Sequence, residues 1–285
     1  MKKKNTPRNV DSPKVAIVMS ASSDIGFALC QRWVKAGWQV FGTYRTQSRQ
    51  VEELKKMGVK LVYCDIADIT SIQDATHILR TICSRWDVLV MCPGTQNPIG
   101  PFMKVNINDW DESVRVNFTG VMRFIHDMLP TRRLNSNPEP CVLLYAGGGT
   151  NDAPPNYSAY IISKIALIKM CELLDTEVPD TRFVILGPGW VKTKIHNATV
   201  KAGAARAGAN YQKTLEHISN NEFVPMHTVL NCCDWIIRSS RKEVSGRNFS
   251  VVFDKWDSKE LSQLLLKEHQ LYKLRRYGND RLVKR

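Results

Sequence analysis

The stretch KVAIVMSASSDIG, residues 14–26, joins a short apolar run to a serine-rich turn. The apolar run predicts a buried strand, and helical spacing begins after the turn. In doubly wound α/β folds a phosphate binds where the first strand turns into the first helix, because the helix N-terminus offers unpaired N–H groups there. The stretch therefore indicates such a fold, with a candidate phosphate site at residues 19–26.

Taken alone, this turn is a weak signal for a dinucleotide, because it contains one glycine, Gly26. Glycines let the backbone come close to a pyrophosphate, and a carboxylate beside the pyrophosphate is unfavourable unless it points away. The alternative interpretation is an ordinary strand-to-helix turn in which Asp24 caps the helix.

Short apolar runs alternate with helix-like segments along the rest of the chain, and these continuous runs suit a parallel sheet covered on both faces. We therefore expect an α/β fold with a single Rossmann-type, doubly wound parallel sheet. The expected strands are 14–19, 38–44, 59–66, 87–94, 141–149, 182–189 and 247–253. The expected helices begin after residue 26 and then span 48–58, 70–84, 107–134, 158–177 and 227–240.

Three parts of the chain are expected. Residues 1–13 form a flexible basic N-terminus, and residues 14–256 form the nucleotide-binding Rossmann domain. Within that domain residues 190–222 look irregular or weakly helical and are the expected substrate loop. Residues 257–285 are expected to form a basic helical tail.

Composition and charge narrow the classes of partner. The 285 residues carry a formal net charge of +13, which favours anionic partners. Basic residues are dispersed and no nucleic-acid motif appears, so we expect no nucleic-acid partner. An apolar leader, a membrane span and metal-ligand spacing among the eight scattered cysteines are also missing, so a reduced cytoplasmic protein without a metal is expected.

Further motifs recur in order along residues 14–253. With them the chain resembles the short-chain dehydrogenase/reductase family, classical type, whose first turn is TGxxxGxG and whose catalytic pair is YxxxK. YxxxK alone is common by chance, whereas the ordered set is specific. The matching segments are MSASSDIG (19–26), Asp65-Ile66, MCPG (91–94), Asn117 in VNFTG, Tyr160-xxx-Lys164 and PGWVKT (188–193).

The resemblance implies hydride transfer between a nicotinamide cofactor and a hydroxyl or carbonyl group, in a homodimer or homotetramer. It implies that Lys164 also holds the nicotinamide ribose, that Asn117 helps to position a water for proton relay, and that Thr193 meets the carboxamide. The cofactor-binding residues implied in this way are Ser20, Ser22, Ser23, Asp24, Ile25, Gly26, Tyr44, Arg45, Asp65, Ile66, Pro93, Gly94, Tyr160, Lys164, Pro188, Gly189, Val191 and Thr193.

Tyr160 and Lys164 are four residues apart and so share one face of the expected helix. A cation near the phenol favours the phenolate and lowers the tyrosine pKa. A tyrosine tuned in this way can exchange a proton with a carbonyl or alcohol oxygen near neutral pH. The alternative is a surface helix that carries an incidental tyrosine and lysine.

The sequence departs from the family at the catalytic serine, since Gly147 stands 13 residues before Tyr160. Serine there hydrogen-bonds the substrate carbonyl, whereas glycine offers only a backbone N–H. Thr150 or Tyr145 could substitute through a shifted loop. The glycines of YAGGGTN could instead let a phosphate or sugar come close, or simply form a tight turn.

The second expected strand ends in Thr43-Tyr44-Arg45, without the acidic residue that NAD-dependent enzymes often place there for the ribose 2′-hydroxyl. Arg45 can pair with a 2′-phosphate and stack on adenine. NADP(H) is therefore expected in preference to NAD(H), and the alternative is that Arg45 is only a solvated charge.

The substrate is expected to be a polar anion, because residues 190–222 are basic and poor in bulky apolar side chains. The tail resembles, weakly, that of family members in bacterial surface-polysaccharide and sugar-nucleotide synthesis, which implies a sugar nucleotide. Trp190 and His196 are further candidates for its site. The basic residues concerned are Lys192, Lys194, Lys201, Arg206 and Lys213.

Two other functions stay open at this point. One is a catalytically weak NADP-binding regulator or scaffold, which the degenerate turn and the missing serine favour. The other is a sugar-nucleotide epimerase or dehydratase, against which the spacing of positions 20, 24 and 26 and the short C-terminal part argue.

Overall fold

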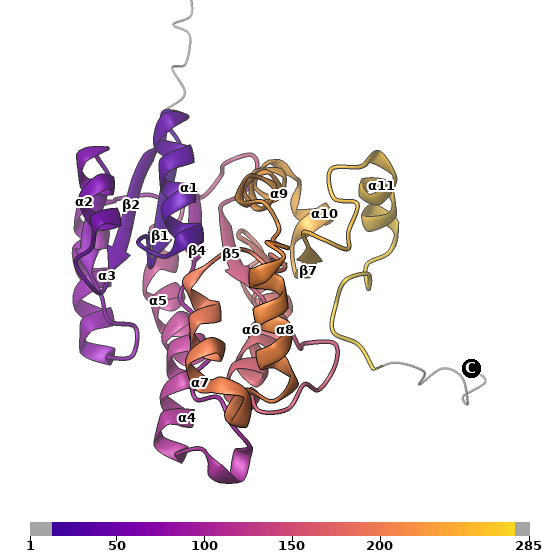
Figure 1. Ribbon diagram of the computed structural model, residues 1–285. Helices are drawn as coiled ribbons and strands as arrows, with labels where there is room; N and C mark the ends of the chain where they lie inside the picture. The colour runs from indigo at the N-terminus through magenta and orange to yellow at the C-terminus, as the bar shows by residue number, and fades with distance from the viewer. Residues whose placement is uncertain (1–12, 277–285) are drawn as a thin grey trace, which may run out of the picture.

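A single sheet of parallel strands forms the centre of the protein, in a computed structural model that describes residues 13–276. Its strands are β1 (Val15–Met19), β2 (Gln39–Tyr44), β3 (Lys60–Tyr63), β4 (Val88–Met91), β5 (Cys141–Tyr145), β6 (Arg182–Gly187) and β7 (Arg247–Ser250). They lie side by side in the order β3-β2-β1-β4-β5-β6-β7. Figure 1 labels five of them, β2, β1, β4, β5 and β7, in this order. The doubly wound α/β fold predicted from the sequence is confirmed.

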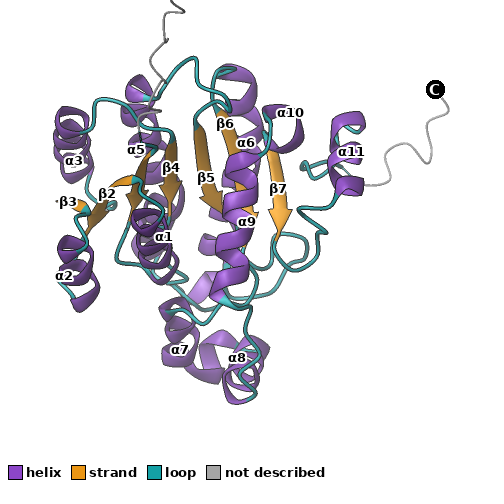
Figure 2. Cartoon of the chain, turned by 90° about the horizontal axis from the view of Figure 1, so that it is seen from above, coloured by secondary structure: helices purple, strands orange, loops and turns teal. Residues whose placement is uncertain are grey.

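Helices cover both faces of this sheet (Figure 2). The α-helices are α1 (Asp24–Lys35), α2 (Arg49–Lys56), α3 (Ile69–Ile82), α4 (Ile107–Val114), α5 (Gly120–Met128), α6 (Ser158–Glu177), α7 (Asn197–Ala207), α8 (Ala209–Ser219), α9 (Met226–Arg238), α10 (Arg241–Val244) and α11 (Lys259–Lys267). Shorter turns are η1 (Phe102–Lys104), the π-helical η2 (Arg115–Thr119), η3 (Leu129–Thr131) and η4 (Lys194–His196).

The alternating side chains of each strand divide the core into two layers. On one face Val18 of β1 packs in the same cluster as Trp33 of α1 and residues of α2 and α9. On the other face Ile17 packs with Phe124 of α5 and residues of α3 and α6. Because β1 is apolar at every position, both of its faces are buried, as expected for an inner strand of a parallel sheet.

The region expected to be irregular or weakly helical, 190–222, contains two helices, α7 and α8. Gly203 and Gly208 adopt φ of 73° and 59°, so they interrupt regular helix geometry and weaken the periodic signal in the sequence. The helices are held by tertiary packing, in a small cluster that includes Tyr157, Ile99 and Ala207. The helical alternative of the expectation therefore describes most of this region.

Other boundaries also differ. The long helix expected over 107–134 is divided into α4, the π-helical turn and α5. The tail contains a helix only at α11, and residues 1–12 and 277–285, with most of the expected flexible N-terminus and the end of the tail, lie outside the described residues. None of the helices within 13–276 is both long and apolar enough to cross a membrane.

A buried guanidinium joins the segment before β5 to the end of α9. Arg182, at the start of β6, is 1% exposed. Its Nε donates to the carbonyl of Glu139 at 2.9 Å. Its Nη1 donates to the carbonyls of Ile236, Ile237 and Ser239 at 3.0, 3.1 and 2.6 Å. These last carbonyls lie at the end of α9, where carbonyls lack partners within the helix, so Arg182 caps α9 from another element.

Arg182→Met should lower the free energy of unfolding by about 3 kcal/mol, because several buried carbonyls lose a charged donor. Urea unfolding followed by circular dichroism measures the change. Arg238→Met is the matched control, since Arg238 is exposed in the last turn of α9, and we expect a change within about 0.5 kcal/mol. Equal losses in the two variants would contradict the role given to Arg182.

Candidate active site

The expected site residues gather at one edge of the sheet. Because all strand pairs are parallel, the segments that follow β1 to β6 leave the sheet at the same edge. The strand order reverses between β1 and β4, which are neighbours in space but not in sequence. Open α/β sheets bind ligands at such a reversal. The structure thus brings the first turn, Arg45, Gly94 and the segment after β6 to one edge.

The first turn depends on two backbone features. Ser20 has a left-handed φ of 58°, which costs an L-residue about 1 kcal/mol, and its N–H donates to Thr43 Oγ1 at 3.0 Å. A Cβ added at Gly26 would lie 2.7 Å from the carbonyl oxygen of Ser20, so residue 26 has to be glycine. Ser20 therefore replaces the family's glycine at the expense of some strain.

The expectation that Asp24 caps the first helix is wrong, because Asp24 does not cap α1. The cap is Ser23, whose hydroxyl accepts the N–H of Gly26 at 3.2 Å. Asp24 is the first helical residue, and its Oδ2 accepts the backbone N–H of Lys194 at 2.8 Å. The carboxylate is thus directed to the segment after β6, because Ser23 already occupies the capping position.

The end of β2 presents a cation. The Arg45 side chain is 63% exposed and lies 3.9 Å from Asp65 Oδ1. Asp65 in turn accepts the N–H of Ala67 at 3.0 Å, so its carboxylate is held by its own turn. Tyr44 packs edge-on against Tyr63 at 6.2 Å between ring centroids. Arg45 is therefore accessible to a phosphate at this edge.

Tyr160 and Lys164 lie side by side on α6, 8% and 4% exposed. The Nζ of Lys164 is 5.7 Å from the centroid of the Tyr160 ring. Burial lowers the pKa of Lys164 to about 8 and raises the pKa of Tyr160 to about 12. The sequence predicted a lowered tyrosine pKa, and the difference arises because desolvation of the phenolate dominates while the ammonium lies over the ring.

Gly147 leaves the space that Tyr160 occupies. A Cβ added at Gly147 would lie 2.3 Å from the Tyr160 hydroxyl and 2.6 Å from its Cζ. Real Cβ atoms do not approach so closely, so a serine here requires the tyrosine to move. Thr150, one suggested substitute for the serine, lies with its neighbours in a turn and is half-buried. Tyr145, the other, is hydrogen-bonded through its hydroxyl to Cys233 Sγ at 3.3 Å.

Asn117 lies in the π-helical turn between α4 and α5 and is fully buried. Its side chain makes two hydrogen bonds with the backbone of Thr95, each of 2.9 Å, and donates to Ser113 Oγ at 3.2 Å. The amide therefore holds the segment after β4 in place. π-helical turns often mark functional sites, because they redirect side chains.

The segment after β6 folds over the same edge. Gly189 has φ 75°, and a Cβ there would lie 2.6 Å from Val252. Val191 is buried, whereas Thr193 caps η4 without a side-chain hydrogen bond. Ile195 reaches toward Gly94: its Cδ1 lies 3.8 Å from the position of an added Cβ at Gly94.

Several contacts in this region were not predicted from the sequence. The ring of Trp190 stacks between His196 and His217, at 4.6 and 4.2 Å between centroids. Tyr157 hydrogen-bonds Thr199 at 2.9 Å and so joins the start of α6 to α7. The sequence named Trp190 and His196 as possible site residues, but no spacing rule connects them with residue 217.

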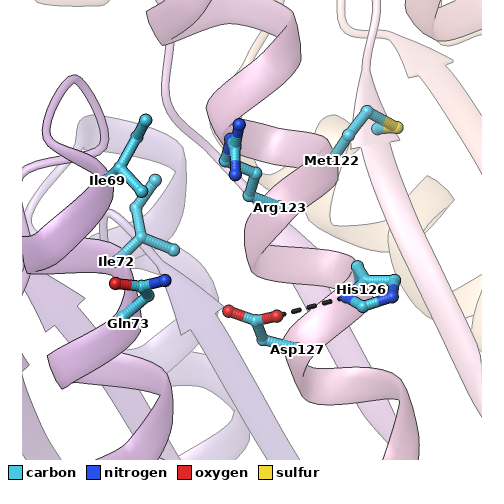
Figure 3. Close-up of a pocket in the computed structure, with 7 residues that line it drawn as sticks. All are labelled: Ile69, Ile72, Gln73, Met122, Arg123, His126 and Asp127. Carbon is cyan, nitrogen blue, oxygen red and sulfur yellow. Dashed lines mark hydrogen bonds and ion pairs between the residues drawn. The ribbon is translucent and has the colours of Figure 1, made fainter.

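A groove with a volume of about 420 Å³ opens between α3 and α5 (Figure 3). It contains none of the expected catalytic or cofactor residues, so it is separate from the site at the sheet edge. The residues that line it are Ile69, Ile72, Gln73, Met122, Arg123, His126 and Asp127.

Two places at this edge suit a bound nicotinamide dinucleotide, and a third, the first turn, is unfavourable for it. Arg45 can receive a phosphate at the end of β2. An added Cβ at Gly94 would lie 3.6 Å from Asn117 Oδ1 and 3.8 Å from Lys164 Nζ, so the glycine keeps space beside the buried lysine. Asp24, in contrast, brings a carboxylate to the turn expected to receive the diphosphate.

Comparisons with known proteins agree with this architecture. The family model described as short chain dehydrogenase matches residues 14–204. A serine 3-dehydrogenase of Agrobacterium fabrum is 31% identical over 121 residues, which cover 40% of this chain and 47% of the relative. The mouse dehydrogenase/reductase SDR family member 4 is 26% identical over 197 residues, with 66% and 70% covered. The chain thus spans about half the length of the first of these relatives and 70% of the second.

Solved structures show the same fold. The KRED1-Pglu enzyme superposes with a TM-score of 0.74 at 22% identity, covering 82% of this chain and 99% of that one. An actinorhodin polyketide ketoreductase variant with NADPH superposes with a TM-score of 0.71 at 21% identity, covering 84% and 95%. The family predicted from the motifs is confirmed: the chain belongs to the short chain dehydrogenase family, whose members are oxidoreductases that use nicotinamide cofactors.

Proposed function

We propose that this chain is an NADP(H)-dependent oxidoreductase that interconverts a hydroxyl and a carbonyl group, with Tyr160 as general acid and base. The observation that carries the proposal is the burial of Tyr160 beside Lys164 at the edge where the strand order reverses. Burying an ammonium is unfavourable, and such groups concentrate at functional sites. Membership of an oxidoreductase family supports the same reaction class.

The chain's own part in this reaction is to hold and move one proton. When bound, the nicotinamide supplies the hydride. With a pKa of about 12, Tyr160 is protonated at neutral pH and can donate its proton to a carbonyl oxygen. The Lys164 ammonium then stabilises the phenolate, which accepts a proton from an alcohol in the opposite direction. Asn117 keeps the segment after β4 beside this pair.

The preference for NADP(H) rests on Arg45, whose guanidinium is largely exposed at the end of β2. A planar guanidinium binds a phosphate through two parallel hydrogen bonds. Asp65, the nearest carboxylate with which Arg45 pairs, follows β3 rather than β2, and it accepts an N–H from its own turn. We infer that Arg45 receives the 2′-phosphate of the adenosine ribose.

The proposed substrate is a polar anion such as a sugar nucleotide. Its support is that the basic side chains of the segment after β6 are exposed around α7 and α8, where they can meet negative charge. A role in polysaccharide synthesis, a homodimer or homotetramer and a cytoplasmic location stay predictions from the sequence. The basic residues concerned are Lys192, Lys194, Lys201, Arg206 and Lys213.

A cofactor-binding regulator with little catalysis is the second candidate function. Two observations favour it: glycine and not serine stands at position 147 against Tyr160, and Asp24 places a carboxylate in the first turn. The sugar-nucleotide epimerase or dehydratase suggested as a further alternative gains no support from a specific contact among the described residues.

Tyr160→Phe should lower kcat roughly a thousandfold while leaving NADPH affinity within a factor of about two, because only the transferred proton is lost. Turnover is followed by nicotinamide absorbance with a panel of sugar nucleotides and simple carbonyls. Tyr63→Phe, on the exposed side of β3, is the control. A cellular effect or turnover that survives in Tyr160→Phe would favour the regulator.

Arg45→Ala should raise the dissociation constant of NADPH roughly tenfold or more and leave that of NADH nearly unchanged, because only NADPH carries the 2′-phosphate. Fluorescence titration of the two cofactors gives both constants. Arg49→Ala is the matched control, since Arg49 is exposed and paired with Glu53 on the surface of α2. Equal weakening of NADPH and NADH would count against this role of Arg45.

Gly147→Ala should lower kcat roughly a hundredfold, because the added Cβ displaces the Tyr160 hydroxyl from its present position. Gly148→Ala is a close control, since an added Cβ there has no heavy atom within 4 Å. Steady-state kinetics and thermal unfolding of both variants separate lost activity from lost stability. Similar activity in the two variants would show that Gly147 does not position Tyr160.

A further inference from the structure

One hydrogen bond joins the first turn to the segment after β6. Oδ2 of Asp24 accepts the backbone N–H of Lys194 at 2.8 Å, between residues 170 positions apart. Asp24 is the first residue of α1, and Lys194 begins η4 directly after Thr193. The bond therefore spans the distance between two strands that are not neighbours in the sheet, β1 and β6.

The same segment approaches the sheet edge at a second point. Cδ1 of Ile195 and Nζ of Lys164 both lie 3.8 Å from the position of an added Cβ at Gly94. Residues 194 and 195 thus contact the first turn on one side and, on the other, approach the space beside Gly94 that Lys164 also borders. The segment therefore comes near both of the points that the proposed dinucleotide would contact, the first turn and Lys164.

The charge of Asp24 opposes such a ligand. Within residues 13–276 the Asp24 carboxylate forms no ion pair, and its recorded partner is a neutral peptide N–H. The side chain is half-buried, so solvent screens it only in part. Like charges about 4 Å apart repel by about 1 kcal/mol in water and by several times more at a partly buried site.

We propose that Asp24 sets the affinity of this chain for its dinucleotide: in the free protein the carboxylate holds residues 194–195 against the first turn, and it repels the diphosphate that has to replace this contact. The inference rests on the proposed function, since it takes the ligand to be a nicotinamide dinucleotide. It gives Asp24 the role of a positioning residue, because Asp24 acts through the segment after β6 and not on the reacting groups Tyr160 and Lys164.

Two substitutions at position 24 distinguish the effect of the carboxylate charge from the effect of its hydrogen bond to Lys194. Asp24→Asn removes the charge and keeps an oxygen that can accept the Lys194 N–H, whereas Asp24→Gly removes both. Asp152→Asn is the control for net charge, since Asp152 is exposed on the loop after β5. Dissociation constants for NADPH and NADH are measured by isothermal titration calorimetry on the full-length chain. Exchange of the Lys194 amide hydrogen is measured without cofactor.

Both Asp24 variants should bind NADPH and NADH roughly tenfold more tightly than the parent chain, with no change in Asp152→Asn. The Lys194 amide should exchange slowly in the parent and in Asp24→Asn and faster in Asp24→Gly, which tests the contact without any cofactor. Tighter binding in both variants together with this exchange pattern would support the proposal.

Failure takes two distinct forms. If the parent and both variants bind the dinucleotides equally well, or the variants bind them more weakly, the role of Asp24 is overturned while the proposed function stands. If none of the proteins binds NADPH or NADH, the proposed function itself fails and this inference fails with it. Equal exchange of the Lys194 amide in all three proteins would overturn the Asp24 contact.

Discussion

The parallel pairing of the strands is the constraint on which the rest of the protein depends. Because β1 pairs in parallel with both β2 and β4, every strand presents its carboxyl end to one edge, and the connections leave the sheet on opposite faces at the point of reversal. This geometry brings together Arg45, Gly94 and Tyr160, which are far apart in sequence. The apolar layers on both faces stabilise the sheet.

Two residues at that edge, Gly147 and Asp24, depart from the family pattern, and each lies against another part of the candidate site. Gly147, in place of a serine, leaves the space that the Tyr160 hydroxyl occupies. Asp24, in place of a glycine, accepts the N–H of Lys194 in the segment after β6. In each case the altered residue lies next to a group from another segment of the chain. The changes therefore alter the geometry and charge of the site within an unchanged fold.

Much of this could be predicted from the sequence. The apolar runs located all seven strands, and the 158–177 pattern matched α6 to the residue. The motifs identified the family, which the comparison confirms. The sequence left 190–222 between irregular and weakly helical because its small residues and glycines carry little periodicity, and the helices there are stabilised by contacts with Tyr157 and Ile99. The roles of the individual site residues stay predictions until they are tested.

The sequence by itself determined the doubly wound sheet, the family and the set of residues at its carboxyl edge, because hydrophobic periodicity and motif order are local properties of the chain. Only the tertiary structure decided the state of those residues. Burial, which depends on neighbours from distant segments, raises the pKa of Tyr160 where a nearby lysine alone predicted a decrease. The partner of Asp24 is likewise set by folding, since Lys194 comes within hydrogen-bond distance only when β6 takes its place in the sheet.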